Sequence, residues 1–357
     1  MTTEGSLTQE RHRGVDEVVL AAPRGFCAGV EMAIKALAWM VSTNPPPVYC
    51  YHEIVHNQSV VEAFETAGVV FVSDIDDVPE GAPLMLSAHG SSPEVVRAAR
   101  GRGGLVVDAV CPLVTKVHHE VKTRSQKGYE IIYVGHQGHD EAIGTIAVAP
   151  ESTHLVETES DVNQLELAPD SAGVALIAQT TLSHSEWAGI LSRARRRFPD
   201  LWLPGREDLC YATTNRQKAV QLLAQETDAI FVVGSENSSN TRALVKVAVD
   251  AGCQRTKRID HAGEISDDDL FGVRIAGVTA GASAPENLVN DVIARLDPRN
   301  GVRELRAVEE AEYFPLPPAL REHIRKQVPP QGDDEYDDRT WTASKALESL
   351  SPIVHRD

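Results

Sequence analysis

Three cysteines each follow an apolar, strand-like run and immediately precede a helix-like run. They are Cys27 in VVLAAPRGFCAGVEMAI, Cys111 in LVVDAVCPLVTKVHHEV and Cys210 in PGREDLCYATTNRQKAV. At such a junction each sulfur lies near a helix N-terminus, where the helix dipole favours the thiolate form that binds metals. If three similar units were arranged around an axis, the sulfurs would converge on one point. Three thiolates would hold a metal centre there and leave one coordination position open.

The pattern of strands and helices repeats three times along the chain, which predicts an α/β protein of three similar units around a pseudo-threefold axis. The first unit is expected to begin with the strand before Cys27. Periodicity alone leaves an ordinary α/β arrangement open, because any α/β protein alternates in this way; the placement of the cysteines favours the repeat. We predict three α/β domains, over residues 17–110, 111–208 and 209–325. A flexible N-terminal tail, residues 1–16, is expected before them, and an acidic, flexible C-terminal tail, residues 326–357, is expected after them.

Charge and hydropathy exclude several classes of protein. The net charge of −18 argues against a general nucleic-acid binder, which needs a basic surface. The N-terminus is polar, and no apolar run approaches the roughly 18 residues that span a bilayer, so we expect a cytoplasmic protein that does not enter membranes. In that reducing compartment the cysteines are expected to be free, metal-bound or catalytic. Cys50 lies within a strand and Cys253 beside a glycine turn, so both are interpreted as packing residues.

Two further sets of strand-to-helix loops carry most of the chemically useful polar residues. Ligands of parallel α/β sheets bind beyond the carboxyl ends of the strands, where helix N-termini present free N–H groups. These loops therefore predict a phosphate or diphosphate site, and a buried Glu141 within it would have a raised pKa and serve as a proton donor. The alternative stays open that the serines and threonines are helix caps and that the histidines are bonded to the backbone. The loop residues are His56, His139, Glu141, Ser238, Ser239 and Asn240 in the first set, and His89, Thr180 and Ser283 in the second.

A series of motifs resembles one enzyme family over roughly residues 17–323. In chain order they are PRGFCAGV, EIVHN, SAHG, DAVCPLVTKVH, GHQGHDEAIGT, QTTLS, DLCYATTNRQ, GSENSSN and VTAGASAPENLV. Together they are similar to the 4-hydroxy-3-methylbut-2-enyl diphosphate reductase family. Such an ordered set is far more specific than any one motif.

The resemblance implies a trefoil of three α/β domains around one 4Fe–4S cluster per chain. Cys27, Cys111 and Cys210 match the ligand positions, and the fourth iron would bind the substrate's hydroxyl oxygen. Thr180 and Glu141 match groups near the hydroxymethyl end of the substrate, with Glu141 as the proton source. The residues that match the diphosphate site and pocket lining are His56, His89, His139, Ser238, Ser239, Asn240 and Ser283.

The implied reaction is reductive removal of the allylic hydroxyl group of (E)-4-hydroxy-3-methylbut-2-enyl diphosphate. Its products would be isopentenyl and dimethylallyl diphosphate, in the last step of the methylerythritol phosphate route to isoprenoids. Reduced ferredoxin or flavodoxin would supply the electrons, and the chain is expected to be a monomer or weak homodimer. Two other classes remain open: a zinc hydrolase, which would be colourless and need no reductant, and a non-catalytic diphosphate-binding redox sensor, which would bind without turnover.

Overall fold

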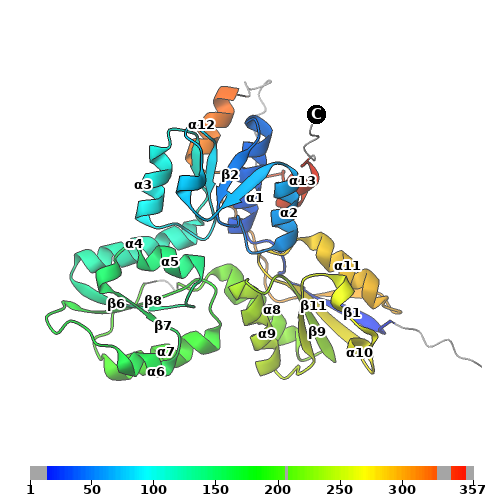
Figure 1. Cartoon of the computed structure of the whole chain (residues 1–357). Helices are drawn as coiled ribbons and strands as arrows, with labels where there is room; N and C mark the ends of the chain where they lie inside the picture. Colours follow the sequence, from blue (N-terminus) through cyan, green and yellow to red (C-terminus); the bar gives the residue numbers. More distant parts are fainter. Residues whose placement is uncertain (1–13, 206–207, 328–338, 351–357) are drawn as a thin grey trace, which may run out of the picture.

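The computed structural model describes residues 14–205, 208–327 and 339–350. These residues form three parallel sheets of five, four and three strands. Figure 1 shows that each sheet lies in its own lobe and that the three lobes surround a common centre. None of the helices in these ranges combines the length and the apolar character needed to cross a bilayer. The arrangement of three parallel sheets in three lobes around one centre confirms the predicted trefoil of α/β units.

The first lobe contains a four-stranded sheet of strand order β3-β2-β4-β5. Its main core lies between this sheet and the first long helix, where Ile34, Leu37, Cys50 and Val107 are fully buried. An apolar face on the helix and apolar strands meet there, as the sequence pattern predicts. The elements are β2 (Val48–Tyr51), β3 (Val69–Val72), β4 (Leu84–Leu86), β5 (Val106–Asp108), α1 (Ala28–Thr43), α2 (Gln58–Thr66), η1 (Ile75–Asp77) and α3 (Pro93–Gly101).

The second lobe contains a three-stranded sheet of strand order β7-β6-β8. Its long helices begin with favourable residues: Pro112 is the first residue of α4, and Ser183 and Glu186 form a capping box on α7. The elements are α4 (Pro112–Gln126), β6 (Tyr129–Val134), α5 (Asp140–Ile146), η2 (Pro150–Ser152), β7 (Thr153–Val156), α6 (Glu159–Gln164), β8 (Gly173–Ala178) and α7 (His184–Arg197).

The third lobe contains a five-stranded sheet of strand order β10-β9-β11-β1-β12. The N-terminal strand β1 lies between β11 and β12, so the expectation that it belongs to the first unit is wrong. Its residues are buried on both faces, which suits an interior strand of a parallel sheet. The elements are β1 (Glu17–Ala22), α8 (Tyr211–Leu223), β9 (Ala229–Val233), α9 (Ser239–Asp250), β10 (Thr256–Ile259), η3 (Ala262–Glu264), α10 (Asp267–Leu270), β11 (Ile275–Ala280), α11 (Glu286–Leu296) and β12 (Val302–Arg306).

Each cysteine lies where the chain passes from one sheet to the helix of the next lobe. Strand β5, which precedes Cys111, belongs to the first sheet, and Trp202, which precedes Cys210, forms a parallel bridge to Ala175 of the second sheet. Strand β1, which precedes Cys27, belongs to the third sheet. Helices α1, α4 and α8 then contact the first, second and third lobes respectively. This cyclic exchange directs all three cysteines toward the centre of the trefoil.

The C-terminal segments return to the first lobe, which corrects two predictions. Helix α12 (Pro318–Gln327) contacts α1 and β5, although residues up to 325 were assigned to the third domain. Helix α13 (Ala343–Glu348) contacts α1 and buries Ala343 and Ala346, so this part of the predicted flexible tail is docked. Trp341 also meets Trp39 of α1 edge-on, with ring centroids 5.5 Å apart.

The last residues of the predicted N-terminal tail are docked as well, because Val15 is buried and the backbone N–H groups of Val15 and Asp16 donate to the carbonyl oxygens of Leu296 and Arg274. Residues 1–13, 328–338 and 351–357 of the predicted tails lie outside the described ranges.

Candidate active site

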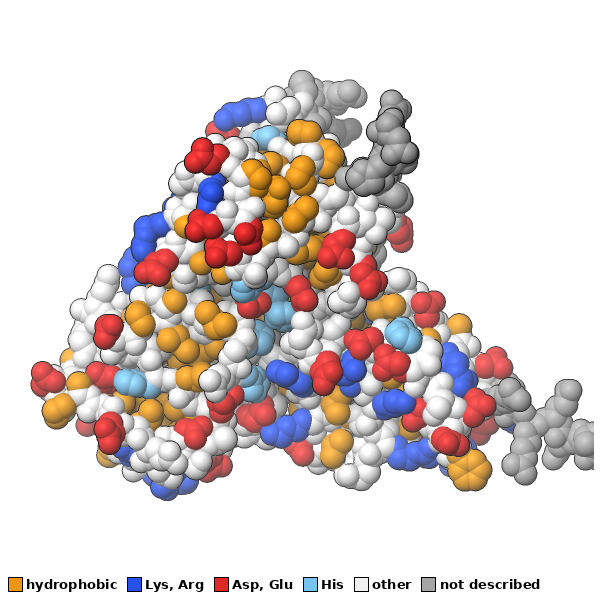
Figure 2. All heavy atoms as spheres, viewed as in Figure 1, with side chains coloured by type: hydrophobic (Ala, Val, Ile, Leu, Met, Phe, Trp, Pro, Cys, Tyr) orange, Lys and Arg blue, Asp and Glu red, His pale blue; other side chains and the backbone are white. Residues whose placement is uncertain are grey.

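A cavity at the meeting point of the three lobes holds all the residues that the sequence nominated. Figure 2 shows histidine side chains gathered in the hollow between the lobes. We call this space the central cavity; the nominated residues that line it are Cys27, His56, His89, Cys111, His139, Glu141, Thr180, Cys210, Ser238, Ser239, Asn240 and Ser283.

The three cysteines occupy equivalent positions. Each is the N-cap residue of its helix, and none of the three side chains accepts a capping hydrogen bond. Their backbone N–H groups donate to three equivalent loop carbonyls. The acceptors are Ala282 for Cys27 at 3.2 Å, Ala88 for Cys111 at 3.1 Å and Thr180 for Cys210 at 3.0 Å. Each thiol is therefore fixed by the loop of the unit before it and remains available to a ligand.

The sulfurs face one shared space. A Cβ atom added at Gly29 would lie 2.8 Å from Sγ of Cys111 and 3.9 Å from Sγ of Cys27, so only glycine leaves room for both. Burial raises the pKa of Cys111 to about 12, and the nearby Cys27 adds to this shift. Burial also raises the pKa of Cys210, and its neighbours Cys27 and Cys111 add to that shift. A bound metal reverses this preference because it stabilises thiolates. Soft thiolate donors of this kind suit an iron–sulfur or zinc centre.

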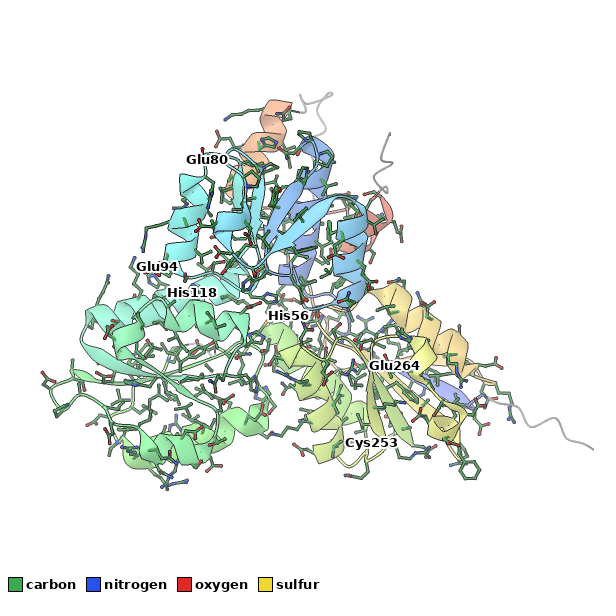
Figure 3. All side chains as sticks on the ribbon, in the orientation of Figure 1. His56, Glu80, Glu94, His118, Cys253 and Glu264 are labelled. Carbon is green, nitrogen blue, oxygen red and sulfur yellow. The ribbon has the colours of Figure 1, made fainter. Side chains whose placement is uncertain are left out.

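The two remaining cysteines lie away from the cavity. Cys50 is fully buried in β2, and Cys253 is buried in a core of the third lobe. Figure 3 shows Cys253 at the outer end of its lobe, whereas His56 lies at the centre of the molecule. The interpretation of Cys50 and Cys253 as packing residues is confirmed.

Glu141 lies at the start of α5 and is 2% exposed. Oε1 accepts a hydrogen bond from the backbone N–H of Thr180 and Oε2 accepts one from its hydroxyl, both at 2.8 Å. Burial raises the pKa of Glu141 to about 7, although the two bonds from Thr180 act in the opposite direction. The direction of this shift agrees with the prediction, and this carboxyl group can hold a proton near neutral pH.

Three histidines of the cavity lining form a compact cluster. The rings of His56 and His89 are stacked with centroids 3.9 Å apart, and His139 lies edge-on to both. Nδ1 of His139 accepts a hydrogen bond from the backbone N–H of Glu141 at 3.1 Å, which leaves the hydrogen on Nε2. Burial lowers the pKa of His139 to about 3 and lowers the pKa of His89 well below its usual value. Neutral imidazoles here can donate N–H groups to an anion.

A buried amide donor without a partner also points to an anion. Within the described residues, Nδ2 of Asn240 is buried and makes no hydrogen bond. Nε2 of His56 and Nδ1 of His89 also make no hydrogen bond, but they lie 4.0 and 3.7 Å from Oδ2 of Asp140. The Oδ1 atom of Asn240 accepts from the backbone N–H of Ala282 at 3.0 Å, so its amide donor is the group left over. Buried donors normally have partners. A phosphate group in the central cavity would satisfy the amide donor of Asn240.

The alternative of simple capping also holds for part of the set. Ser238 is the N-cap of α9 and accepts from the backbone N–H of Thr241, and His139 is the N-cap of α5. Ser283 donates to the backbone carbonyl of His56 at 2.9 Å, which joins the third lobe to the first. These residues therefore shape the cavity as well as line it.

The site residues predicted from the sequence leave out two threonines and a network between lobes, although Thr181, Gln179 and His136 lie in the same polar loops. Thr181 and Thr213 also line the central cavity. Gln179 donates to Thr181 at 2.7 Å and to Ser239 at 3.3 Å. The Oγ atom of Ser239 also lies 3.1 Å from Nδ1 of His136. The motifs QTT and YATTN contain the threonines, but no spacing rule indicated which hydroxyl faces the centre.

The comparisons with known proteins agree with this geometry. The 4-hydroxy-3-methylbut-2-enyl diphosphate reductase of Rhodopirellula baltica is 47% identical over 316 residues, which cover 87% of this chain and 98% of the relative. The reductase of the same name from Leifsonia xyli is 46% identical and covers 87% of this chain and 93% of the relative. The solved structure of the E-1-hydroxy-2-methyl-but-2-enyl-4-diphosphate reductase from Plasmodium falciparum matches with a TM-score of 0.84 and 33% identity, covering 88% of this chain and 99% of that chain. The model of the LytB protein family matches residues 18–297. The chain therefore belongs to the LytB protein family.

Proposed function

We propose that the chain is a 4-hydroxy-3-methylbut-2-enyl diphosphate reductase that releases isopentenyl and dimethylallyl diphosphate. The observation that carries the proposal is the convergence of three uncapped thiols, a protonatable carboxyl group and the buried, unpartnered amide donor of Asn240 in one cavity. Replacement of an allylic hydroxyl group by hydrogen needs these functions together, because the leaving oxygen takes one proton and departs as water, while the carbon skeleton takes two electrons and a second proton.

A 4Fe–4S cluster fits the donor set formed by Cys27, Cys111 and Cys210. All three cysteines line the central cavity, and Gly29 leaves room for the sulfurs of Cys27 and Cys111. The raised pKa values of Cys111 and Cys210 fall when a cationic centre binds. When bound, such a cluster supplies electrons that side chains cannot supply, and an iron without a protein ligand.

The anion end of the cavity holds the diphosphate of the substrate. Asn240 and Ser238 lie at the N-terminus of α9, where backbone N–H groups and the helix dipole favour negative charge. The neutral histidines add ring N–H donors, with His139 held in the Nε2–H form by its bond from Glu141. Anchoring the diphosphate in this way orients the hydroxymethyl end toward the thiols and lowers the entropic barrier to reaction.

The acid end of the cavity delivers a proton to the departing hydroxyl group. Glu141 keeps its proton near neutral pH because it is buried, and Thr180 contacts both of its oxygens. A general acid of this kind contributes about 10²–10⁴ in rate. The apolar residues Val30, Val55 and Val114 complete the wall and restrict water around the acid.

The electron donor is a small redox protein of the ferredoxin or flavodoxin class, and the reaction takes place in the cytoplasm. Both statements follow from the chemistry proposed: the cluster needs an external reductant, and free thiols and iron–sulfur centres persist in a reducing compartment.

Anaerobic purification tests the proposal directly. The purified chain should be brown and should contain the iron and sulfide of one 4Fe–4S cluster per chain. With a strong chemical reductant it should convert (E)-4-hydroxy-3-methylbut-2-enyl diphosphate to both products. A colourless protein that binds zinc and turns over without reductant would identify a hydrolase. A brown protein that binds the diphosphate without turnover would identify a sensor.

A further inference from the structure

We infer that Arg216 is a positioning residue for Cys27, with Glu310 as its counter-ion. The inference rests on the proposed function, in which Cys27 holds the cluster. Arg216 lies on α8, the helix that begins directly after Cys210, and is 1% exposed. Its side chain thus connects the helix of one cysteine to the loop of another.

The guanidinium group binds the backbone just before Cys27. Nε and Nη2 of Arg216 donate to the carbonyl oxygen of Gly25 at 3.1 and 2.7 Å, and Nη2 donates to the carbonyl oxygen of Phe26 at 3.3 Å. Gly25 adopts a φ of +66°, a conformation that favours glycine and directs this carbonyl toward α8. A planar group with several donors in a fixed geometry suits two adjacent carbonyls, and the flexible side chain of a lysine lacks that fixed geometry.

The other side of the same loop is held by the third sheet. The backbone N–H groups of Gly25 and Cys27 donate to the carbonyl oxygens of Ala280 and Ala282, both at 3.2 Å. The loop is therefore fixed between the end of β11 and the side chain of Arg216. Because Arg216 belongs to the Cys210 helix, it sets the position of Cys27 relative to Cys210.

Glu310 neutralises the buried charge. Nη1 of Arg216 lies 3.1 and 3.2 Å from the two carboxylate oxygens of Glu310, and Asn215 donates to Oε1 at 3.0 Å. A buried ion pair is weak evidence for stability, since apolar side chains of similar volume often serve as well. Its value here is therefore geometric: the pair orients a fork of donors onto two carbonyls.

A second charge pair performs the same task at the next cysteine. Lys116 lies on α4, which follows Cys111, and its Nζ is 3.1 Å from Oδ1 of Asp208, two residues before Cys210. The other oxygen of Asp208 accepts from the backbone N–H of Ala178 at 3.1 Å. Two of the three links between neighbouring cysteines thus use a cation from one cysteine's helix to hold the loop of the next.

The double variant with Arg216→Met and Glu310→Leu provides the sharpest test. It removes both charges and retains much of the volume, so it is designed to fold even if a single variant leaves one charge unpaired and unfolds. The single variant Glu310→Gln and the exposed control Glu226→Gln, which affects only the Arg303 pair, complete the set. The measurements are the rate of iron loss to a chelator, the midpoint potential of the cluster and the unfolding midpoint.

We expect the double variant to unfold at the wild-type midpoint yet lose iron about tenfold faster, the change that follows loss of one charge-assisted hydrogen bond. Glu310→Gln should raise the midpoint potential, because an uncompensated guanidinium beside Cys27 favours the reduced, more negative cluster. Glu226→Gln should match the wild type. A rate of iron loss in the double variant equal to that of the wild type would overturn the inference.

A cluster-free readout separates this inference from the proposed function. In the metal-free chain, the rate of alkylation of Cys27 relative to Cys111 should rise in the double variant, since the Cys27 loop loses its hold on α8. If the wild type carries no cluster, the proposed function fails while this comparison still decides the role of Arg216. An unchanged alkylation ratio would show that Arg216 does not position Cys27.

Discussion

The carboxylate of Glu141 is held at both oxygens by the single residue Thr180. The backbone N–H of Thr180 binds Oε1 and its hydroxyl binds Oε2, each at 2.8 Å. A backbone N–H group can only donate, so the proton of a protonated Glu141 lies on Oε2. The hydroxyl of Thr180 then accepts that proton's hydrogen bond and can donate its own hydrogen into the central cavity. Thr180 thereby connects the buried acid to the central cavity.

Replacing Thr180 by valine tests this link, because valine keeps the shape and removes only the hydroxyl group. We expect kcat to fall about tenfold to a hundredfold, as for the loss of one hydrogen bond to an ionisable group. The pKa of Glu141 should rise further, since the bond from the Thr180 side chain lowers it. Thr180→Ser keeps the hydroxyl and should remain within severalfold of the wild type. A pH profile of kcat for both variants checks the two expectations; equal profiles would exclude a role for the hydroxyl.

Substitution of the cysteines should divide them into two groups. Cys27→Ser, Cys111→Ser or Cys210→Ser should lose iron and nearly all activity, because an alcohol is a hard donor that binds iron–sulfur irons poorly. Cys50→Ala and Cys253→Ser remove thiols that lie outside the central cavity and should retain the colour. Iron and sulfide analysis of the purified variants provides the measurement. Loss of the cluster in either control would show that the assignment of three ligands is wrong.

Local patterns in the sequence predicted the strands, the long helices and the junctions that carry the cysteines. They could not place β1, because a strand that is apolar on both faces fits the interior of any parallel sheet. Only its pairing with β11 and β12, far away in the chain, decides its sheet. Docking of α13 was hidden for a related reason: its buried contacts are the small residues Ala343 and Ala346, which carry little hydrophobic signal.

The central cavity was predictable as a set of residues, since polar loops at the carboxyl ends of parallel strands meet at one edge. The contacts between lobes were not predictable from the sequence. The bond from Ser283 to the carbonyl of His56 and the bonds of Arg216 to the Cys27 loop join residues about 190 or more positions apart. No periodicity in one segment reports such partners, because each depends on how the lobes meet.

Asn240→Ala should weaken diphosphate binding specifically. The free Nδ2 donor of Asn240 is buried in the central cavity, so its loss should raise the dissociation constant about tenfold to a hundredfold. Calorimetric titration with inorganic diphosphate measures this dissociation constant without turnover. Asn290→Ala on the exposed face of α11 is the matched control and should bind normally. An unchanged constant for Asn240→Ala would remove this residue from the anion site.

Trp341→Ala should loosen the docked C-terminal segment. The ring of Trp341 meets Trp39 of α1 edge-on, and the backbone N–H of Ala343 donates to the Glu31 carboxylate at 2.7 Å. We expect a loss of about 2 kcal/mol in unfolding free energy, less than for a fully buried aromatic residue, because Trp341 is only partly buried. Hydrogen exchange should accelerate in α13 and on the adjoining face of α1. Lys345→Ala, an exposed change on the same helix, should alter neither quantity; equal exchange in both variants would contradict docking.

Glu141→Gln keeps the size of the side chain and can still bond to Thr180, but it cannot donate an acid proton. The variant should therefore keep its cluster and bind substrate while turnover falls by a factor of about 10²–10⁴.

Because the pKa of Glu141 is raised to about 7, the wild-type carboxyl group holds its proton below that pH, and kcat should fall as the pH rises through it. The residual rate of the variant should lack this dependence. Protonation of Glu141 also stabilises the folded chain, so wild-type stability should decline between about pH 4.5 and 7 more steeply than that of the variant.

Two measurements on Glu141→Gln under anaerobic conditions separate loss of the proton donor from loss of binding: the substrate-induced change in the cluster spectrum and the steady-state rate. A near-normal rate would mean that the proton has another source, and failure to bind substrate would make Glu141 a structural residue of its loop.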